Sequence, residues 1–551
     1  PTGRCTQEIS PETPYICPKA CFAHPRYLER IVYTIPINAG LNKNTCSFNP
    51  NLIFRESYRV ARIPRRRGLN IAMRHRNLKT SHYRILAFLA IIAAAGVSNS
   101  SGQEKLKHPN LVIFVADDLG WNDVGYHDSV IKTPNIDSLT RQGVELNRFY
   151  VYPFCSPTRT ALLTGRSPLG LGITRPIGGD AVLPLDEHLL PQTLKSSGYQ
   201  TLMSGKWHLG SRDETALPHK RGFDSFYGHA GGFIDYYTHQ RGGGLRRRPG
   251  GTQQGETPPP DWQRNGKTLV EEGYSTQLIG KEAIRLLRKR DKKKPTFLYV
   301  TFNAPHTPLQ APQEFIDRYK SVENEDRRVF AAMVDAMDVE IGKILKVIDE
   351  EKMRDNTIVL FMSDNGGSAR GGASNAPLNS GKGSVYEGGI RVPAVIRWPG
   401  VLPAGKKLDQ LTTAHDLFPT LATALGVKPL NKKPFYGQDL WKSFRTGKIV
   451  PHKDVLIASQ SIALFHGEWK LIQGRGVNGG PGYRELFLIN ADPQERFDLS
   501  KVYPELTEAL GAIIDRFPKG EPLSSRRGRG GQGRRQRGPE SGQQRPRQQQ
   551  P

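Results

Sequence analysis

Short runs of apolar residues alternate with amphipathic stretches through the middle of the chain. The runs have the length and composition of buried strands: Leu111–Ala116, Thr201–Met203, Phe297–Phe302, Ile358–Met362 and Val392–Ile396. The clearest helical pattern runs from Arg328 to Glu350, with apolar residues recurring every three or four positions. Alternation of strands and helices is typical of a sheet covered on both faces. The sequence therefore predicts an α/β fold with a large mixed, mostly parallel sheet flanked by helices.

The pattern changes after about residue 440. Apolar runs at Val455–Ile457, Trp469–Ile472 and Leu486–Ile489 are separated by loops of Gly, Asn and Pro, and an amphipathic segment follows at Glu505–Phe517. Short strands spaced in this way indicate a small antiparallel sheet, here closed by one helix. We therefore expect a large domain over residues 108–440 and a C-terminal α+β subdomain over residues 441–518.

The N-terminal part of the chain carries the pattern of an export signal. Met73 is the first methionine; a basic stretch follows it, then the apolar run Ile85–Val97 and a polar, small-residue exit. This predicts a signal peptide over residues 73–101, with an apolar run too short for a comfortable membrane span. Residues 1–72 are interpreted as a mis-assigned upstream extension, the alternative being a genuine basic domain with an internal anchor. The expected protein is exported, to the periplasm, the cell exterior or a lysosome, with no membrane span in its mature form.

The formal net charge of +26 is concentrated at the two ends of the chain. Residues 1–100 hold 15 basic and 4 acidic side chains, and residues 519–551 hold 9 and 2. The latter segment has no apolar residue after Leu523 that could anchor a core, so we expect a disordered basic tail over 519–551. An excess of charge outside the folded body argues against specific binding of nucleic acid.

Polar motifs follow four of the predicted strands directly. Because the carboxyl ends of parallel strands share one edge of a sheet, where ligands bind, we expect these motifs to converge. Each motif taken alone also has a purely structural explanation. The acidic pair and Asp-Asn-Gly-Gly can form turns, and the lysines and histidines can be solvated loop residues. The side chains expected at this edge are Asp117, Asp118, Lys206, His208, His306, Asp364 and Asn365, joined by Lys382 from a glycine-rich loop.

Cys155 begins the most distinctive motif of the chain. Pro157 suits the first turn of a helix, which places Cys155 at a helix N-terminus, where free amides and the helix dipole favour an anion. Arg159 lies about one turn further on and can donate a fork of hydrogen bonds to an oxyanion. The other four cysteines precede residue 50, so the expected mature chain has a single cysteine and no internal disulfide.

The block Cys-x-Pro-x-Arg-x-x-x-Leu-Thr-Gly-Arg over residues 155–166 resembles the signature of formylglycine-dependent (type I) sulfatases. Other segments between residues 108 and 518 also resemble this family: Pro109–Gly120, Thr133–Asp137, Gly205–Gly210, Arg221–Asp224, Asp364–Gly367 and Glu485–Phe487. Within the family, the sequences of Gly120–Gly125 and Ser384–Gly389 are most similar to those of arylsulfatase B, the N-acetylgalactosamine 4-sulfatase. The chain departs from the family where Thr158 replaces the common serine, and where the disulfides of animal members are lacking. The resemblance implies an alkaline-phosphatase-like fold and makes residues 108–440 the catalytic domain.

An all-oxygen donor set suits Ca²⁺ or Mg²⁺ better than Zn²⁺. The resemblance implies one Ca²⁺, held together with residue 155 by Asp117, Asp118, Asp364 and Asn365. It also implies that a formylglycine-generating or sulfatase-maturing enzyme oxidises Cys155 to 3-oxoalanine (formylglycine).

The resemblance further implies a role for each remaining residue. A hydroxyl of the hydrated aldehyde at 155 would attack sulfur, helped by Asp364 as proton acceptor, while Arg159 orients that hydroxyl. Lys206 and Lys382 would bind sulfate oxygens. His306 would protonate the departing alcohol, and His208 would take the proton of the second hydroxyl so that sulfate is released.

The expected function is hydrolysis of sulfate esters of a sulfated sugar or polysaccharide, by a sulfuric ester hydrolase. One alternative is a phosphonate or phosphate monoester hydrolase of the same superfamily; another is an unmodified, catalytically silent binder of sulfated glycans. The segments Gly170–Gly179 and His229–Arg241 are candidate specificity loops.

Overall fold

The computed structural model describes residues 108–241, 260–475 and 481–521. The predicted upstream extension (1–72), the predicted signal peptide (73–101) and residues 522–551 of the predicted tail lie outside the described residues. Within the described ranges, no helix combines the length and apolar character needed to cross a bilayer.

A ten-stranded sheet forms the centre of the described chain, in the order β11-β2-β10-β9-β1-β8-β4-β5-β6-β7. Its five central strands β9, β1, β8, β4 and β5 are parallel, whereas β10 is antiparallel to β9 and β2. The strands are β1 (Asn110–Ala116), β2 (Val144–Leu146), β4 (Gln200–Lys206), β5 (Ser225–His229), β6 (Gln263–Arg264), β7 (Lys267–Thr268), β8 (Thr296–Thr301), β9 (Thr357–Ser363), β10 (Ala394–Arg397) and β11 (Lys406–Leu408). β3 (Phe149–Tyr150) and β12 (Thr412–Thr413) form a separate parallel pair. The predicted mixed, mostly parallel sheet is confirmed.

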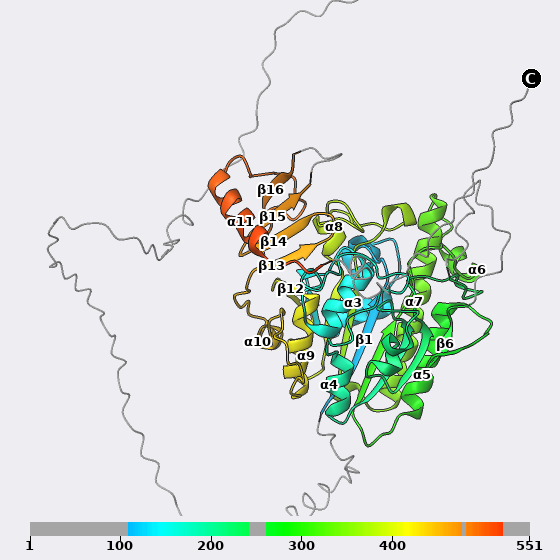
Figure 1. Cartoon of the computed structure of the whole chain (residues 1–551). Helices are drawn as coiled ribbons and strands as arrows, with labels where there is room; N and C mark the ends of the chain where they lie inside the picture. Colours follow the sequence, from blue (N-terminus) through cyan, green and yellow to red (C-terminus); the bar gives the residue numbers. More distant parts are fainter. Residues whose placement is uncertain (1–107, 242–259, 476–480, 522–551) are drawn as a thin grey trace, which may run out of the picture. The chain divides into compact units, whose positions relative to one another are not determined.

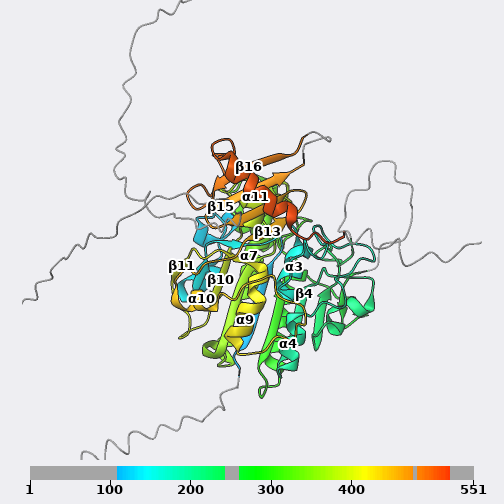
Figure 2. The ribbon, with the colours of Figure 1, turned by 60° about the vertical axis from the view of Figure 1, so that its left-hand side comes forward.

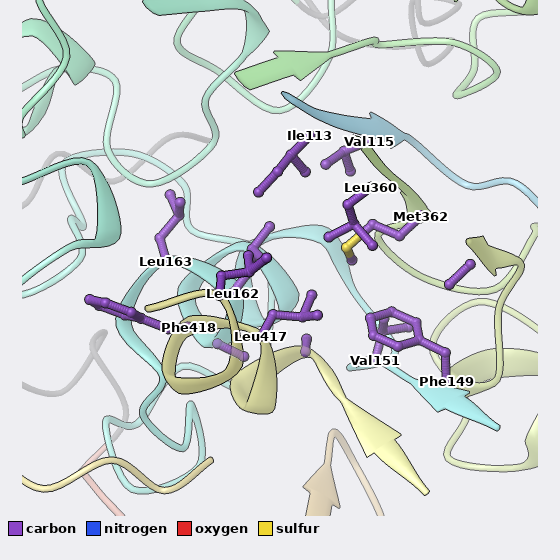
Figure 3. Packing of buried hydrophobic residues seen from close by; sticks show 14 of the residues in the cluster. Ile113, Val115, Phe149, Val151, Leu162, Leu163, Leu360, Met362, Leu417 and Phe418 are labelled. Atoms are coloured by element: carbon purple, nitrogen blue, oxygen red, sulfur yellow. The ribbon is translucent and has the colours of Figure 1, made fainter. Parts of the chain in front are cut away.

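Helices cover both faces of this sheet (Figure 1), and every residue of β1, β8 and β9 is therefore buried. On one face lie α5 (Ser275–Lys289) and α7 (Glu325–Glu350), which pack on Val112 and Phe114 of β1. On the other lie α3 (Cys155–Thr164), α4 (Leu190–Ser196) and α9 (Leu417–Leu425). In Figure 3, Ile113 and Val115 of β1 and Leu360 and Met362 of β9 lie close to Leu162 of α3 and Leu417 of α9. The remaining α-helices are α2 (Pro134–Gln142), α6 (Gln313–Ile316), α8 (Glu387–Ile390), α10 (Trp441–Thr446) and α11 (Pro504–Arg516).

A second, four-stranded antiparallel sheet follows near the C-terminus (Figure 2). It consists of β13 (Val455–Ala458), β14 (Ile462–His466), β15 (Trp469–Gly474) and β16 (Tyr483–Leu488). One face packs on α11 through residues such as Leu464 and Leu510, and the other joins the main core through Ile457 and Phe465. The predicted small sheet with a closing helix is confirmed, with β14 as an additional strand. The domain boundary between residues 440 and 441 stays a prediction.

A buried charge cluster ties this second sheet to the rest of the molecule. The Lys470 Nζ atom on β15 lies 2.8 Å from an oxygen of Glu387 on α8 and 2.7 Å from an oxygen of Glu495. Glu387 also accepts a hydrogen bond from the Tyr150 hydroxyl at 3.0 Å. All four side chains are buried, so the ammonium of Lys470 is balanced by carboxylate charge inside the protein and not by solvent.

Candidate active site

The four motifs that follow predicted strands meet at the carboxyl edge of the main sheet. Asp117 and Asp118 follow β1, Lys206 ends β4, His306 lies in the loop after β8, and Asp364 follows β9. A pocket of about 410 Å³ opens above them, lined by Cys155, His208, His306 and Lys382 among others. All ten side chains that the sequence analysis assigned to the site lie in or around this pocket, including Arg159 and Asn365 beneath it.

Cys155 is the first residue of α3, and Pro157 lies in the first turn, as predicted. Its side chain is buried, and it is the one cysteine within the described ranges, where it is free. Burial raises the pKa of the thiol to about 12, although the nearby Lys206 ammonium lowers it. Burial therefore favours the neutral thiol over the thiolate at this position.

Arg159 connects α3 to two other elements. Its Nε and one terminal nitrogen donate to the same oxygen of Asp364, at 3.0 and 2.8 Å, and its other terminal nitrogen donates to the Lys206 carbonyl at 2.8 Å. The guanidinium is 1% exposed, so the pair is shielded from solvent. Burial and the neighbouring Asp117 raise the pKa of Asp364 to about 6, against the opposing effect of Arg159.

The two lysines are each paired with one aspartate of the strand-end pair. Lys206 Nζ lies 2.5 Å from an oxygen of Asp117, and Lys382 Nζ lies 2.6 Å from an oxygen of Asp118. Burial alone would raise the pKa of Asp118, but Lys382 and His306 outweigh burial and hold it well below its usual range. Asp118 has φ of 70°, a left-handed conformation that is rare for non-glycine residues and typical of functional sites.

The acidic residues form a group that fits a hard cation. One ligand atom from each of Asp117, Asp118, Cys155 and Asp364 lies within 4.8 Å of the others. Asp117 Oδ1 and Asn365 Oδ1 are buried and have no hydrogen-bond partner among the described residues. The Asn365 amide is oriented by its own donors, which bond Asp118 Oδ1 at 2.7 Å and the Gly366 carbonyl at 2.9 Å. Ca²⁺ or Mg²⁺, which both prefer oxygen ligands, would satisfy buried oxygens that have no hydrogen-bond donor.

The two histidines border the pocket from different elements. His208 follows β4 in a left-handed conformation (φ 59°) and is buried, with no partner for Nδ1 among the described residues. His306 stacks on Phe233 with ring centroids 5.7 Å apart, and its Nε2 lies 3.6 Å from an oxygen of Asp118. Burial lowers the pKa of both imidazoles, that of His306 to about 4, with Asp118 opposing the shift there.

Both candidate specificity loops contribute to the wall of the pocket. Pro176–Gly179 comes from the first loop, and Gly231–Phe233 with Arg241 comes from the second. Sequence analysis did not identify Ser156, whose hydroxyl donates to the His208 carbonyl at 2.9 Å and accepts from the Ile177 amide at 2.9 Å. Ser156 thus joins the start of α3 to a histidine and a loop of the pocket; its position beside Cys155 was the one signal in the sequence.

Thr158, which replaces the common serine, keeps the function of a hydroxyl at that position. Its Oγ1 accepts from the Tyr152 amide at 2.9 Å and donates to the Tyr152 carbonyl at 3.2 Å. A serine hydroxyl could make the same two bonds, so this departure from the family pattern leaves the turn before α3 unchanged.

Comparison with known proteins places this geometry in a family. The family model described as Sulfatase matches residues 109–427. Arylsulfatase J of Mus musculus is 33% identical over 492 residues, covering 78% of this chain and 81% of that protein. Human N-acetylgalactosamine-6-sulfatase is 31% identical over 457 residues, covering 74% of this chain and 84% of that protein.

Solved structures agree with this assignment. The crystal structure of Ps i-CgsB in complex with k-i-k-neocarrahexaose has a TM-score of 0.69 and 35% identity, covering 76% of this chain and 94% of that chain. A phosphonate monoester hydrolase of Agrobacterium radiobacter shares the fold with a TM-score of 0.53 at 18% identity, covering 76% of this chain and 96% of that chain. The specific likeness to arylsulfatase B stays a prediction. With the family model matching more than half of its length, the chain belongs to the sulfatase family and is a sulfuric ester hydrolase.

Proposed function

We propose that this sulfatase hydrolyses sulfate esters of a sulfated sugar or polysaccharide, with residue 155 in its formylglycine form and one Ca²⁺ in the acidic cluster. The observation that carries the proposal is the grouping of Cys155 with three buried carboxylates within 4.8 Å, each carboxylate paired with a different cation. A buried, protonated cysteine at the centre of so many charges has no evident structural purpose.

The metal would be held by Asp117, Asp118, Asp364 and Asn365, whose oxygens include two that lack a donor in the described chain. When bound, Ca²⁺ would act as a Lewis acid toward a sulfate oxygen. Three aspartates and the cations Arg159, Lys206 and Lys382 cancel in charge. A divalent ion therefore gives the site the positive excess that an anionic ester requires.

The formylglycine form of residue 155 would supply the attacking hydroxyl, since a hydrated aldehyde carries two. Arg159 would orient residue 155 through its fixed contacts to Asp364 and the Lys206 carbonyl. Lys382, which is on the wall of the pocket, would bind the sulfate oxygens with Lys206.

His306 and His208 would transfer the protons during hydrolysis of the ester. The Nδ1 of His306 lies 2.6 Å from the Thr307 carbonyl, which favours the tautomer protonated at Nδ1 when the ring is neutral. Its Nε2 would then be the nitrogen that takes up a proton, giving the imidazolium, and passes that proton to the departing alcohol. His208 lines the pocket beside Cys155 and would accept the proton of the second hydroxyl.

The sugar substrate is supported by the relatives. The N-acetylgalactosamine-6-sulfatase is named for a sulfated amino sugar, and the Ps i-CgsB structure holds a neocarrahexaose. We also propose export through the leader at 73–101 and oxidation of Cys155 by a formylglycine-generating or sulfatase-maturing enzyme. N-terminal sequencing of the native secreted protein tests the leader.

The test of function is sulfate release from a panel of sulfated monosaccharides and size-defined sulfated hexasaccharides, combined with the intact mass of the same sample. We expect released sulfate, and a chain about 18 Da lighter than the cysteine form. Release of phosphate or phosphonate products without sulfate would favour the monoester-hydrolase alternative. Glycan binding with the full cysteine mass and no release from any substrate would favour the silent binder.

A further inference from the structure

A second hollow, here termed the basic cleft, lies beside the C-terminal sheet. It has a volume of about 850 Å³, roughly twice that of the active-site pocket. It is bounded by the turn between β13 and β14, the facing ends of β15 and β16, and a loop after α3. Lys519, just beyond α11, also lines it. None of these residues belongs to the catalytic machinery described above.

The basic cleft and the active-site pocket have adjoining walls. Arg175 lines the cleft, and the next residue, Pro176, lines the pocket. On another side, the hydroxyl of Ser459 in the cleft donates to the Gly383 carbonyl at 3.0 Å, and Gly383 directly follows Lys382 of the pocket. A chain-like ligand seated in the pocket can therefore continue into the cleft.

Three side chains give the cleft its charge: Arg175, Arg475 and Lys519. All three are exposed, and none has a hydrogen bond or ion pair to another described residue. No carboxylate is among the described residues of the cleft wall. Three unpaired cations around one hollow repel one another, and a bound anion would relieve that repulsion.

The uncharged side chains of the cleft suit a carbohydrate. Tyr483 is 37% exposed and lines the cleft, with its hydroxyl 3.2 Å from Ser461 Oγ. The amide of Gln460 is exposed and has no partner among the described residues. An aromatic face with adjacent amide and hydroxyl groups can contact the apolar face and the hydroxyls of a sugar ring.

We propose that the basic cleft binds a second sulfate group of the same glycan chain whose ester is cleaved in the active-site pocket. This inference rests on the proposed function and narrows it: the substrate is an oligosaccharide or polysaccharide that carries sulfate on more than one sugar. Arg175, Arg475 and Lys519 bind that second sulfate and set the preference for a long substrate, without acting on the reacting ester.

The test compares two substrates and two triple variants of the full, matured chain. The substrates are the sulfated hexasaccharide from which the wild type releases sulfate fastest in the panel above, and the sulfated monosaccharide that forms its cleaved end. The cleft variant is Arg175→Gln/Arg475→Gln/Lys519→Gln. The control variant, Lys281→Gln/Lys289→Gln/Lys293→Gln, removes the same charge from α5 and the turn after it, where no described residue lines either hollow.

The cleft variant should lose about 10- to 100-fold in kcat/KM on the hexasaccharide, chiefly through KM, because each exposed contact to an anion contributes modestly. Its kcat/KM on the monosaccharide should stay within about twofold of wild type, as should both values for the control. Added salt should weaken wild-type turnover of the hexasaccharide more than that of the variant.

Equal losses on both substrates, or no loss on the hexasaccharide, would overturn the cleft assignment while leaving the sulfatase activity standing. A wild type that releases sulfate from no sugar contradicts the proposed function itself, so the two failures are distinguishable. The three substituted residues are exposed, and a thermal unfolding midpoint equal to that of the control excludes misfolding as the cause of a loss.

Discussion

The Cβ atom that Gly232 lacks would lie 2.8 Å from Nε2 and 2.9 Å from Cε1 of His208. The imidazole therefore occupies the space in which any side chain at position 232 would begin. Both residues line the active-site pocket, and His208 is held there by a left-handed backbone and by the bond from Ser156 to its carbonyl.

Gly232→Ala should displace the His208 ring and lower kcat about 10- to 100-fold, because a shift of a catalytic group by about 1 Å is enough for such a loss. Steady-state kinetics on the best sugar sulfate measures the effect. Gly178→Ala is the matched control, since Gly178 lines the same pocket and a Cβ there meets nothing within 4 Å. Equal activity of the two variants would show that the position of His208 does not limit turnover.

Asn365→Ala should weaken Ca²⁺ binding roughly 10- to 100-fold, because it removes one uncharged oxygen from the proposed donor set. The fold should persist, since Asn365 takes part in no ion pair within the described chain. Calorimetric titration of chelator-treated protein measures affinity, and excess Ca²⁺ should restore part of the activity. Asn490→Ala, at an exposed turn, is the control. An unchanged calcium affinity would remove Asn365 from the ligand set.

Asp117→Ala, unlike Asn365→Ala, should also lower the free energy of unfolding, by about 3 kcal/mol. The reason is that it leaves the buried ammonium of Lys206 without its carboxylate. Denaturant unfolding of the metal-free proteins isolates this effect from calcium binding. The double variant Asp117→Ala/Lys206→Met should recover much of the lost stability while remaining inactive. If the double variant is as unstable as Asp117→Ala, the loss of the ion pair is not the cause of the lower stability.

Cys155→Ser, His208→Ala and His306→Ala should fail at different points of the cycle. A serine hydroxyl can accept sulfate but has no second hydroxyl for its release, and loss of His208 should slow the same release. Loss of His306 should instead slow the attack, most for alkyl sulfates, whose leaving groups need a proton. Mass spectrometry during turnover should show an adduct of about 80 Da on the first two variants only. Multiple turnover by the serine variant would contradict the formylglycine mechanism.

Glu495→Gln should change how stability depends on pH. Burial raises the pKa of Glu495 to about 7, with Glu387 adding to the shift and Lys470 opposing it. Because the folded pKa exceeds the unfolded one, the stabilisation from the bound proton is complete below about pH 4.5 and is lost as pH rises through about 7.

The stability of the wild type relative to Glu495→Gln should therefore fall by about 3 kcal/mol across that window. Denaturant unfolding at pH values from 4.5 to 8 measures it, and Glu468→Gln, at an exposed turn, should show no such trend relative to wild type. A stability difference between wild type and Glu495→Gln that is constant with pH would contradict the assignment.

The central strands and the grouping of the candidate site residues at their carboxyl ends were predictable because their signals are local. An apolar run followed by Asp117-Asp118, or a cysteine placed before Pro157 and Arg159, has a meaning that does not depend on distant residues. The antiparallel direction of β10 was not predictable, since an apolar run such as Val392–Ile396 reads the same in either direction.

Features built from distant segments were missed for a related physical reason. Lys470 falls in a run predicted as a strand, but nothing near it in the sequence reveals that Glu387 and Glu495 neutralise it. The basic cleft likewise draws Arg175, Arg475 and Lys519 from three separate parts of the chain, each unremarkable in its own context.

The cluster of Lys470, Glu387 and Glu495 also limits how this sequence can recombine with its relatives. A crossover near residue 440 would bring a foreign β15 under the original Glu387. An incoming segment without a lysine at 470 would leave the buried carboxylate of Glu387 without its ammonium partner at the seam between the two sheets. We therefore expect Glu387 and Lys470 to be inherited together, although they lie 83 positions apart in the chain.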